Sequence, residues 1–312
     1  MKKLPRIFRH GYVMRRVLTV TLLCIGTAVS VFIGLNQRYG WSPEFTWRSI
    51  YQRTGLGLNP YSEAPCQVRV LDVGAGDAIL IRCDAQWILV DTGLDTSRKE
   101  LERALHRCGV RRLSMLIVSH DHTDHTGGLE MVLKEFRPER VLLGKDPPAL
   151  PSTDDAVRWL CRKYGAMTIA AETGDCYIIG NLSVEVLSDG SAFSDENNRS
   201  LVLRMRYGMT TMLFTGDAEV RTEKQLLASG TDLCADWLKV AHHGSHSASS
   251  EEFLAAVAPG YAAISCGWNN PPDEEVIQRL RALNVCYART DLHGELLFYT
   301  DGKNCGMMTE KD

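Results

Sequence analysis

The first 65 residues differ in hydrophobic pattern from the rest of the chain. Residues 17–35 form an uncharged, almost wholly apolar run, about the length of a helix that crosses a bilayer. Residues 1–16 carry six lysines and arginines, and the first acidic residue is Glu44. By the positive-inside rule, we expect a basic cytoplasmic tail over 1–16, a transmembrane anchor over 17–35 and an extracellular chain beyond it.

Two other interpretations of the apolar run exist. Ala28-Val29-Ser30 is an acceptable small-residue cleavage site, so a signal peptide and a secreted protein are the first alternative. A buried core helix is the second. The run continues past the cleavage site without a polar break, which favours an uncleaved anchor. Residues 36–65 contain three prolines and several glycines, a composition typical of a linker.

From residue 66 onward, short apolar or alternating segments, typical of strands, are interspersed with longer amphipathic segments, typical of helices. This pattern predicts one α/β domain over 66–312. The domain is expected to have two β-rich halves, each closed by helices. Strands are expected at 67–73, 78–83, 87–91, 113–119, 140–144, 182–187, 200–207, 210–215, 237–241, 262–266, 286–289 and 295–300. Helices are expected at 97–109, 129–136, 154–164, 219–229, 251–257 and 273–283.

A cluster of metal-binding side chains follows the strand at 113–119. His120, His122, Asp124 and His125 lie within six positions, although the chain has nine histidines in all. Imidazole nitrogen and carboxylate oxygen suit zinc and its first-row neighbours as ligands. A loop at a strand end lets such neighbours converge on one point, so this segment predicts a metal site.

Further candidates follow other predicted strands. Asp217 comes after the strand at 210–215, and Gly216 before it allows a tight turn. His242 and His243 follow the strand at 237–241, and Asp91 ends the strand at 87–91. A hydrolase site with two metal ions needs a carboxylate that can contact both of them. Asp217 could also act as an N-cap for the helix at 219–229.

The spacing H-x-H-x-D-H resembles the signature of the metallo-β-lactamase superfamily. This resemblance implies a four-layer αββα sandwich that binds two divalent metal ions. It implies that Asp217 bridges them, that Asp124 is both ligand and catalytic group, and that Asp91 orients the histidine loop. One of the two adjacent histidines would be the last ligand. We predict His242, which lies at the strand end, and expect His243 to contact the scissile group or donate a proton.

One part of that family's pattern is missing. The family usually has a further metal histidine before the bridging aspartate, and none occurs between His125 and Asp217. The first site would be weaker, and Asp189, Asp195, Asn197, Asn198 or water would complete it. An oxygen-richer site favours manganese over zinc.

Several strings resemble the extracellular hydrolase domain of ComEC-type DNA-uptake proteins, in order, over about residues 66–300. They are 71–78 (LDVGAGDA), 197–203 (NNRSLVL), 213–218 (LFTGDA), 238–245 (LKVAHHGS), 264–267 (ISCG) and 290–294 (TDLHG). The resemblance implies a metal-dependent nuclease acting on the strand that is not taken up. Asp72 and Asp77 would support the ligands or hold a turn. Asn197, Asn198, Ser200 and Ser245 would contact substrate or metal, or have ordinary turn roles.

Departures from that pattern leave other functions open. Ala75 replaces a glutamine, and the 267–272 segment is shorter and lacks the family's histidine. A single span cannot form a DNA channel, so a separate uptake-channel protein would be a partner. The alternatives are a cell-envelope phosphodiesterase or esterase acting on phosphorylcholine, teichoic acid or a small ester, and a non-catalytic binding module.

Charge and cysteines constrain the picture further. Residues 1–65 hold nine of the 35 basic and two of the 38 acidic residues, so residues 66–312 carry a net charge of −10. This argues against broad electrostatic capture of nucleic acid, but leaves room for a local basic groove. The ten cysteines include no CxxC pair. We expect them to be scattered core residues without a disulfide framework or a metal role.

Overall fold

The computed structural model describes residues 64–145 and 156–311, together with Thr19, Thr21, Gly26, Thr27 and residues 29–32. The predicted cytoplasmic tail, most of the predicted anchor and nearly all of the predicted linker lie outside these residues. Among the described residues, no helix has both the length and the apolar character needed to cross a membrane. The chain divides into two compact units, Met1–Ser62 and Glu63–Asp312, and the second is described below.

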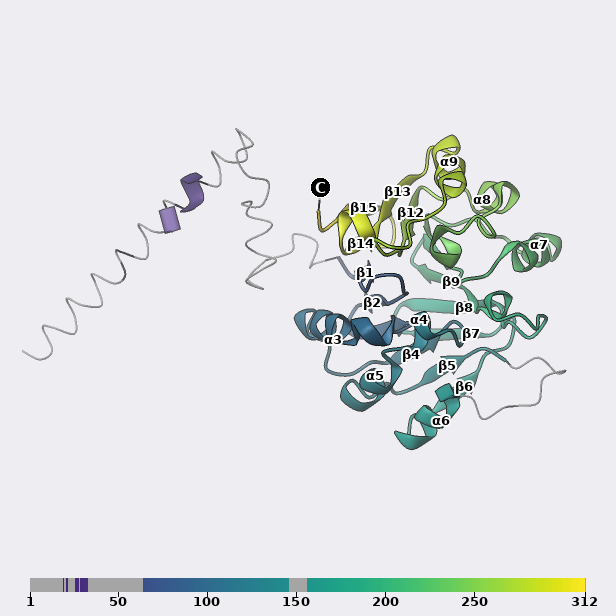
Figure 1. Ribbon diagram of the computed structural model, residues 1–312, viewed down its shortest axis with the longest axis horizontal. Helices are drawn as coiled ribbons and strands as arrows, with labels where there is room; N and C mark the ends of the chain where they lie inside the picture. The colour runs from purple at the N-terminus through teal and green to yellow at the C-terminus, as the bar shows by residue number, and fades with distance from the viewer. Residues whose placement is uncertain are drawn as a thin grey trace, which may run out of the picture. The chain divides into compact units, whose positions relative to one another are not determined.

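Two mixed sheets form the centre of this unit (Figure 1). The first has the strand order β15 (Cys305–Thr309), β14 (Leu296–Thr300), β1 (Cys66–Val70), β2 (Ile79–Cys83), β3 (Gln86–Val90), β4 (Met115–Val118), β5 (Val141–Leu143) and β6 (Thr168–Ala170). The second has the order β13 (Cys286–Arg289), β12 (Tyr261–Ile264), β11 (Trp237–Lys239), β10 (Thr210–Phe214), β9 (Val202–Tyr207), β8 (Leu182–Ser188) and β7 (Cys176–Ile179).

Helices cover the outer face of each sheet (Figure 1). Helices α3 (Arg98–Arg107), α5 (Leu129–Glu135) and α6 (Ala156–Lys163) pack on the first sheet, and α7 (Val220–Ala228), α8 (Glu251–Val257) and α9 (Glu274–Ala282) on the second. One apolar cluster joins the two sheets, and one more lies under each helical layer. These three cores confirm the predicted four-layer αββα sandwich.

Each sheet has a parallel half, and these halves position the site. Strands β3 to β6 are parallel in the first sheet, and β10 to β13 are parallel in the second. Parallel neighbours bring their carboxyl ends to the same edge, where the connecting loops can form a site. The loops after β3, β4, β10 and β11 carry Asp91, the histidine loop, Asp217 and the adjacent histidines His242 and His243.

The predicted strands and helices are present, with ends that shift by a few residues. Prediction missed β6, β7 and β15. β6 has only three residues, and β7 and β15 are edge strands whose side chains are mostly exposed or half-buried. Edge strands lack the apolar burial that produces a strong sequence pattern.

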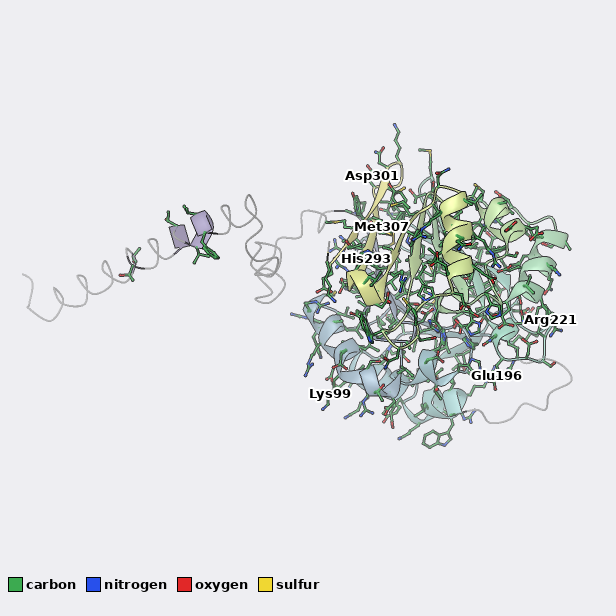
Figure 2. The ribbon with its side chains drawn as sticks, turned by 45° about the horizontal axis from the view of Figure 1, so that its top comes forward. Lys99, Glu196, Arg221, His293, Asp301 and Met307 are labelled. Carbon is green, nitrogen blue, oxygen red and sulfur yellow. A yellow bond between two sulfur atoms is a disulfide. The ribbon has the colours of Figure 1, made fainter. Side chains whose placement is uncertain are left out.

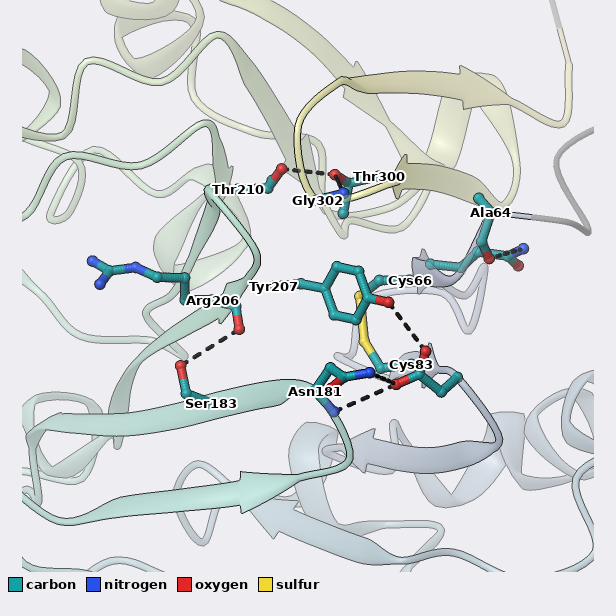
Figure 3. Close-up of a disulfide and its surroundings, with 12 residues drawn as sticks. Ala64, Cys66, Cys83, Asn181, Ser183, Arg206, Tyr207, Thr210, Thr300 and Gly302 are labelled. Carbon is teal, nitrogen blue, oxygen red and sulfur yellow. Dashed lines mark hydrogen bonds between the residues drawn. A yellow bond between two sulfur atoms is a disulfide. The ribbon is translucent and has the colours of Figure 1, made fainter.

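The cysteine prediction was wrong for one pair. Cys66 on β1 and Cys83 on β2 are direct partners in the antiparallel ladder and form a disulfide (Figure 3). Three other cysteines, Cys176, Cys234 and Cys286, are exposed and not in the core. Sequence reasoning could not see the pairing because it depends on the strand register, which places two residues 17 apart in sequence opposite one another.

Candidate metal centre

Asp91 links the end of β3 to the loop after β4. It has a left-handed backbone (φ +59°) and is almost fully buried. Its carboxylate accepts hydrogen bonds from the Ser119 backbone N–H at 2.7 Å and from Ser119 Oγ at 2.6 Å, and lies 2.8 Å from Nδ1 of His125. Asp91 therefore holds the ring of His125 with Nδ1 turned toward the first sheet and Nε2 turned away from it.

The histidine loop packs against the backbone that follows β3. A Cβ atom at Gly127 would lie 2.1 Å from the amide nitrogen of Asp95, and one at Gly128 would lie 2.5 Å from the carbonyl oxygen of Thr92. Only glycine allows this approach. The short helix α4 (Thr123–Thr126) is thereby fixed with Asp124 and His125 on the side of the second sheet's loops.

Asp217 lies at the centre of the cluster. It follows Gly216, whose φ is +50°, and its backbone N–H donates to Ser200 Oγ at 3.0 Å. Its side chain is 1 % exposed. Four imidazole nitrogens surround one carboxylate oxygen, Oδ2. They are Nε2 of His125 at 3.3 Å, His243 at 3.6 Å, His242 at 3.9 Å and His120 at 4.0 Å.

The turn after β11 gives two consecutive histidines a left-handed backbone, with φ of 49° at His242 and 54° at His243. Such a conformation is costly outside glycine and is found mostly at functional sites. It sends the two rings to different partners. His243 is buried, with Nδ1 3.0 Å from the Ser265 carbonyl oxygen and Nε2 3.2 Å from Asp124 Oδ2. His242 is part-exposed, with Nδ1 3.2 Å from Glu219 Oε1.

The geometry favours His243 over the predicted His242 as a metal ligand, although both rings face Asp217. The potential ligand atoms of Asp124, His125, Asp217 and His243 all lie within 4.8 Å of one another. Those of His120, His122 and Asp217 form a second such group. His243, and not the predicted His242, joins the first set. Strand β11 ends at Lys239, and the geometry of the turn after it decides where each ring lies.

The histidines around Asp217 show the pattern expected of metal ligands. Ligating imidazoles usually give their second nitrogen to a carboxylate, carbonyl or similar partner. Asp91 and the Ser265 carbonyl occupy Nδ1 of His125 and His243. In the described part of the chain, Nε2 of both rings and Oδ1 of Asp217 are buried without a hydrogen-bond partner. Unsatisfied buried polar atoms are costly, so the residues present fit a bound cation.

The group formed by His120 and His122 lies beside the first. Nε2 of His120 is 2.9 Å from Nδ1 of His122, and Ser200 Oγ lies 3.3 Å from Nδ1 of His120. The other nitrogen of His122, Nε2, lies 2.5 Å from Glu196 Oε2. In each of these two rings, one nitrogen contacts a serine or glutamate side chain and the other faces the second histidine.

Among the described residues, Asp189 and Asp195 do not belong to the groups of possible metal ligands. Asp189 accepts hydrogen bonds from Thr173 and Ser191. Asp195 accepts from Asn198, whose buried amide oxygen also accepts from Thr222. These contacts hold the loop before β9 together.

The remaining predicted residues divide into near and distant ones. Asp77 is buried, and its Oδ1 lies 3.5 Å from Nδ1 of His243. Asn197 donates to Glu219, and Ser245 contacts Ser247. Asp72 is exposed, because successive residues of an extended segment alternate between faces. The structure does not bring Asp72 to the cluster. Partial burial raises its pKa, and its charged neighbours are Lys311, Glu310 and Asp291.

Three charged residues near the site were missed. Glu196 and Glu219 contact His122 and His242, and Lys239 is buried with its Nζ 2.9 Å from Asp77 Oδ2. A lysine inside the apolar run Trp237–Ala241 was the available signal, since lysine is rarely fully buried without a partner. The two glutamates gave no signal, because surface loops commonly contain such residues.

The cluster shifts the acid–base equilibria of its members. Burial, with the nearby His125, lowers the pKa of His120 to about 3. Burial would also lower the pKa of His125, but the charges of Asp217 and Asp91 outweigh it and raise the pKa well above its ordinary value. The pKa of His243 is raised against burial by Asp217 in the same way. Burial disfavours the charged form of Asp217, yet His125 and His243 hold its pKa well below the usual range.

Metal loading is expected to release protons near neutral pH. Because the pKa values of His125 and His243 are raised, both rings carry protons in the metal-free protein at pH values below those raised values, and a metal requires neutral imidazole. As the pH rises through the raised pKa values, proton release should decline and apparent affinity should increase. Titration calorimetry with Zn²⁺ or Mn²⁺ in two buffers of different ionisation enthalpy measures the protons released. Metal binding without proton release at about pH 6.5 would contradict this prediction.

This arrangement defines a class of protein, a four-layer αββα sandwich with a histidine- and aspartate-rich centre where the strands of its parallel halves end. A model of the metallo-β-lactamase superfamily matches residues 71–268, and the chain belongs to this superfamily. Members of the superfamily are generally metal-dependent hydrolases.

Curated relatives of the chain include a competence protein and a recombination protein. It is 30% identical over 265 residues to ComE operon protein 3 of Bacillus subtilis, matching 78% of this chain and 34% of that protein. It is 32% identical over 266 residues to Competence protein ComA of Neisseria gonorrhoeae, matching 78% and 36%. It is 32% identical over 252 residues to Recombination protein 2 of Haemophilus influenzae, matching 78% and 30%. The chain thus spans about a third of the length of these relatives.

Solved structures agree on the fold. CmlA, a diiron β-hydroxylase from Streptomyces venezuelae, is 13% identical with a TM-score of 0.53, over 77% of this chain and 55% of that one. The metallo-β-lactamase fold protein YhfI from Bacillus subtilis is 13% identical with a TM-score of 0.50, over 75% of this chain and 100% of that one. A hydroxylase on this fold illustrates that the fold does not select the reaction.

Proposed function

We propose that the chain is a membrane-anchored, metal-dependent phosphodiesterase that cleaves DNA. The observation that carries the proposal is the arrangement around Asp217, whose buried carboxylate faces both groups of candidate ligands. Divalent ions bound by such groups supply Lewis acidity and an activated water for hydrolysis. Zinc and manganese both suit this mixture of imidazole and carboxylate.

The residues around the centre have separate tasks in this proposal. Asp91 and Ser265 fix the orientation of His125 and His243 through Nδ1, so that Nε2 of each ring is available for a cation. Asp124 is the more open carboxylate, with 29 % of its side chain exposed, and is placed to orient the attacking water. His242 is part-exposed beside Asp217 and contacts Glu219, and in this proposal it contacts the scissile group.

Two observations support DNA as the substrate. One relative is named as a competence protein and another as a recombination protein, and recombination is a reaction of DNA. In addition, Trp268 is 82% exposed on the loop after β12. Two close backbone contacts connect that loop to the centre. A Cβ atom at Gly267 would lie 2.8 Å from the nitrogen of Ala75, so the loop packs on the segment that contains Ala75 and Gly76. A Cβ atom at Gly76 would in turn lie 2.4 Å from the carbonyl oxygen of Asp124. An exposed tryptophan is a suitable stacking surface for an unpaired base.

The proposed location rests on the amino-terminal sequence. The uncharged run at 17–35 and the basic residues before it support a single anchor with the hydrolase domain on the extracellular side. A DNA-uptake role would then require a separate channel protein as a partner.

The test uses the full-length chain in detergent, stripped of metal and reloaded with Mn²⁺ or Zn²⁺. Cleavage of end-labelled single-stranded DNA is measured beside cleavage of bis-p-nitrophenyl phosphate. Asp217→Asn should lose both activities, and Asp301→Asn, a matched change at an exposed turn, should keep them. Cleavage of the small diester alone would favour the envelope phosphodiesterase instead. Metal binding without turnover of either substrate would contradict the proposed chemistry.

A further inference from the structure

A small cleft, partly open to solvent, lies next to the candidate metal centre. Its walls come from the carboxyl ends of β4 and β5, from α6 and from the segment before β9. Ser119 and His120 form part of the wall, so the cleft shares a residue with the ligand group of His120, His122 and Asp217. Its enclosed volume is about 20 Å³, roughly the space for one water molecule, so a larger anion would bind at its open mouth.

Three cationic side chains from three separate segments line this cleft. Lys145 follows β5, Arg158 lies on α6, and Arg199 belongs to the 3₁₀ turn η2 (Asn197–Arg199). Helix and loop contacts hold two of them in place. Arg158 Nη2 donates to the Gly144 carbonyl at 3.2 Å, and Lys145 Nζ lies 2.8 Å from Glu172.

Two carboxylates also line the cleft, and each has a cationic or imidazole neighbour. Asp121 lies 3.9 Å from Arg199 Nη2. Glu196, at the surface of the domain in Figure 2, lies 2.5 Å from Nε2 of His122. These three cations lie together in a domain whose net charge is −10, although Glu172 pairs with Lys145 and the lining itself contains two carboxylates. Two guanidinium groups that come from separate segments and meet beside the candidate metal centre are suited to bind one anion.

We infer that this cleft binds a phosphate of the nucleic-acid strand next to the one being cleaved. This inference rests on the proposed function. It adds that the cationic residues of the cleft make the protein prefer a polynucleotide to a small diester. Guanidinium groups bind phosphate oxygens through two parallel hydrogen bonds, and lysine adds a point charge. Because His120 belongs to both the cleft wall and the ligand group, a phosphate held by Arg158 and Arg199 lies beside the scissile group, on the His120 side.

The first experiment measures binding without cleavage. Fluorescein-labelled single-stranded dT12, with or without a terminal phosphate, is titrated with full-length protein in EDTA at 50–200 mM salt. Arg158→Ala and Arg199→Gln are compared with the wild type and with Arg162→Ala, a control on the same helix outside the cleft lining. Each cleft variant should weaken binding several-fold at low salt and reduce the slope of log K against log [salt] by about 1. Arg162→Ala should match the wild type.

The second experiment measures cleavage by the metal-loaded proteins. The cleft variants should lose kcat/KM on the oligonucleotide, mainly through KM, and keep it on bis-p-nitrophenyl phosphate, which has no second phosphate. In the binding experiment, if the cleft variants bind both oligonucleotides equally weakly, the cleft contacts an internal phosphate. If they bind only the phosphorylated oligonucleotide more weakly, the cleft contacts the terminal phosphate. Each supports the subsite. Cleft variants that bind like Arg162→Ala would overturn it. The wild-type protein could also bind DNA in a salt-dependent manner, more tightly than the cleft variants, and yet cleave neither substrate. That result would contradict the proposed function but still support the phosphate subsite.

Discussion

Replacing Asp217 by Asn is expected to remove metal binding and hydrolytic activity together. The carboxylate faces four imidazoles and belongs to both groups of candidate ligands. Substitution of residues that only support metal ligands costs about 10–100-fold in affinity or activity. The loss of a carboxylate shared by two groups should therefore exceed about 100-fold. Elemental analysis of protein dialysed against buffered Zn²⁺, and turnover of bis-p-nitrophenyl phosphate, measure the two effects.

The same variant has a signature that does not depend on bound metal. Asp217 is the largest favourable influence on the raised pKa of His125, which burial opposes. Without that charge, the pKa of His125 should fall, and the ring should lose its proton at a lower pH in metal-free protein. Nuclear magnetic resonance titration of the His125 ring distinguishes this local change from unfolding. Metal content of the variant equal to that of wild type would show that Asp217 is not a ligand.

Replacing Lys239 by Met is expected to destabilise the fold more than any surface change. Lys239 and Asp77 form an ion pair at 2.9 Å, and both side chains are 1% exposed. Removing one partner leaves a buried, uncompensated charge and costs about 3–5 kcal/mol. For a domain of this size, each kcal/mol lowers the melting temperature by about 2–4 °C. Differential scanning calorimetry of the metal-free proteins measures the decrease.

Two controls separate charge from packing in this prediction. Lys239→Met combined with Asp77→Asn removes both charges and should recover most of the lost stability. Lys163→Met, which breaks an exposed pair with Glu130, should melt close to wild type. If the double variant were no more stable than Lys239→Met, the ion pair would not explain the loss.

The pH dependence gives a further check on the ion pair. Burial opposes the charge of Asp77, but Lys239 and then His243 lower its pKa below the ordinary value. The pair thus contributes stability above the pKa of an unfolded carboxyl, and this is lost as the pH falls through the folded value. Without Lys239, burial should raise the pKa of Asp77. The difference in free energy of unfolding between wild type and Lys239→Met should then be largest near pH 7 and become smaller as the pH is lowered. Urea denaturation at about pH 5 and 7 measures it.

Much of the centre was visible in the sequence because its residues follow strands. His120, His122, Asp124 and His125 come directly after β4, and Asp217 follows β10. A buried strand has a recognisable apolar run, and the polar residue that ends it stands out. Strand ends in parallel halves meet at one edge, so residues identified separately lie together in the structure. Their role as metal ligands stays a prediction.

Other features depended on geometry that no local pattern contains. The choice of His243 over His242 follows from two left-handed residues in one turn. The placement of Asp72 outside the cluster and Asp77 inside it follows from the path of the glycine-rich segment between β1 and β2. The disulfide follows from the register of β1 against β2. In each case a shift of one residue would turn the side chain elsewhere.

The sequence by itself determined the sandwich, the histidine loop and the superfamily, because burial periodicity and ligand spacing are local properties of the chain. Only the tertiary structure decided which nitrogen of each histidine faces Asp217, that Lys239 neutralises Asp77 beneath the ligands, and that Lys145, Arg158 and Arg199 share one cleft beside His120. These are contacts between segments distant in sequence. They depend on how two sheets and their loops pack, and charge and burial act through space without regard to the order of residues along the chain.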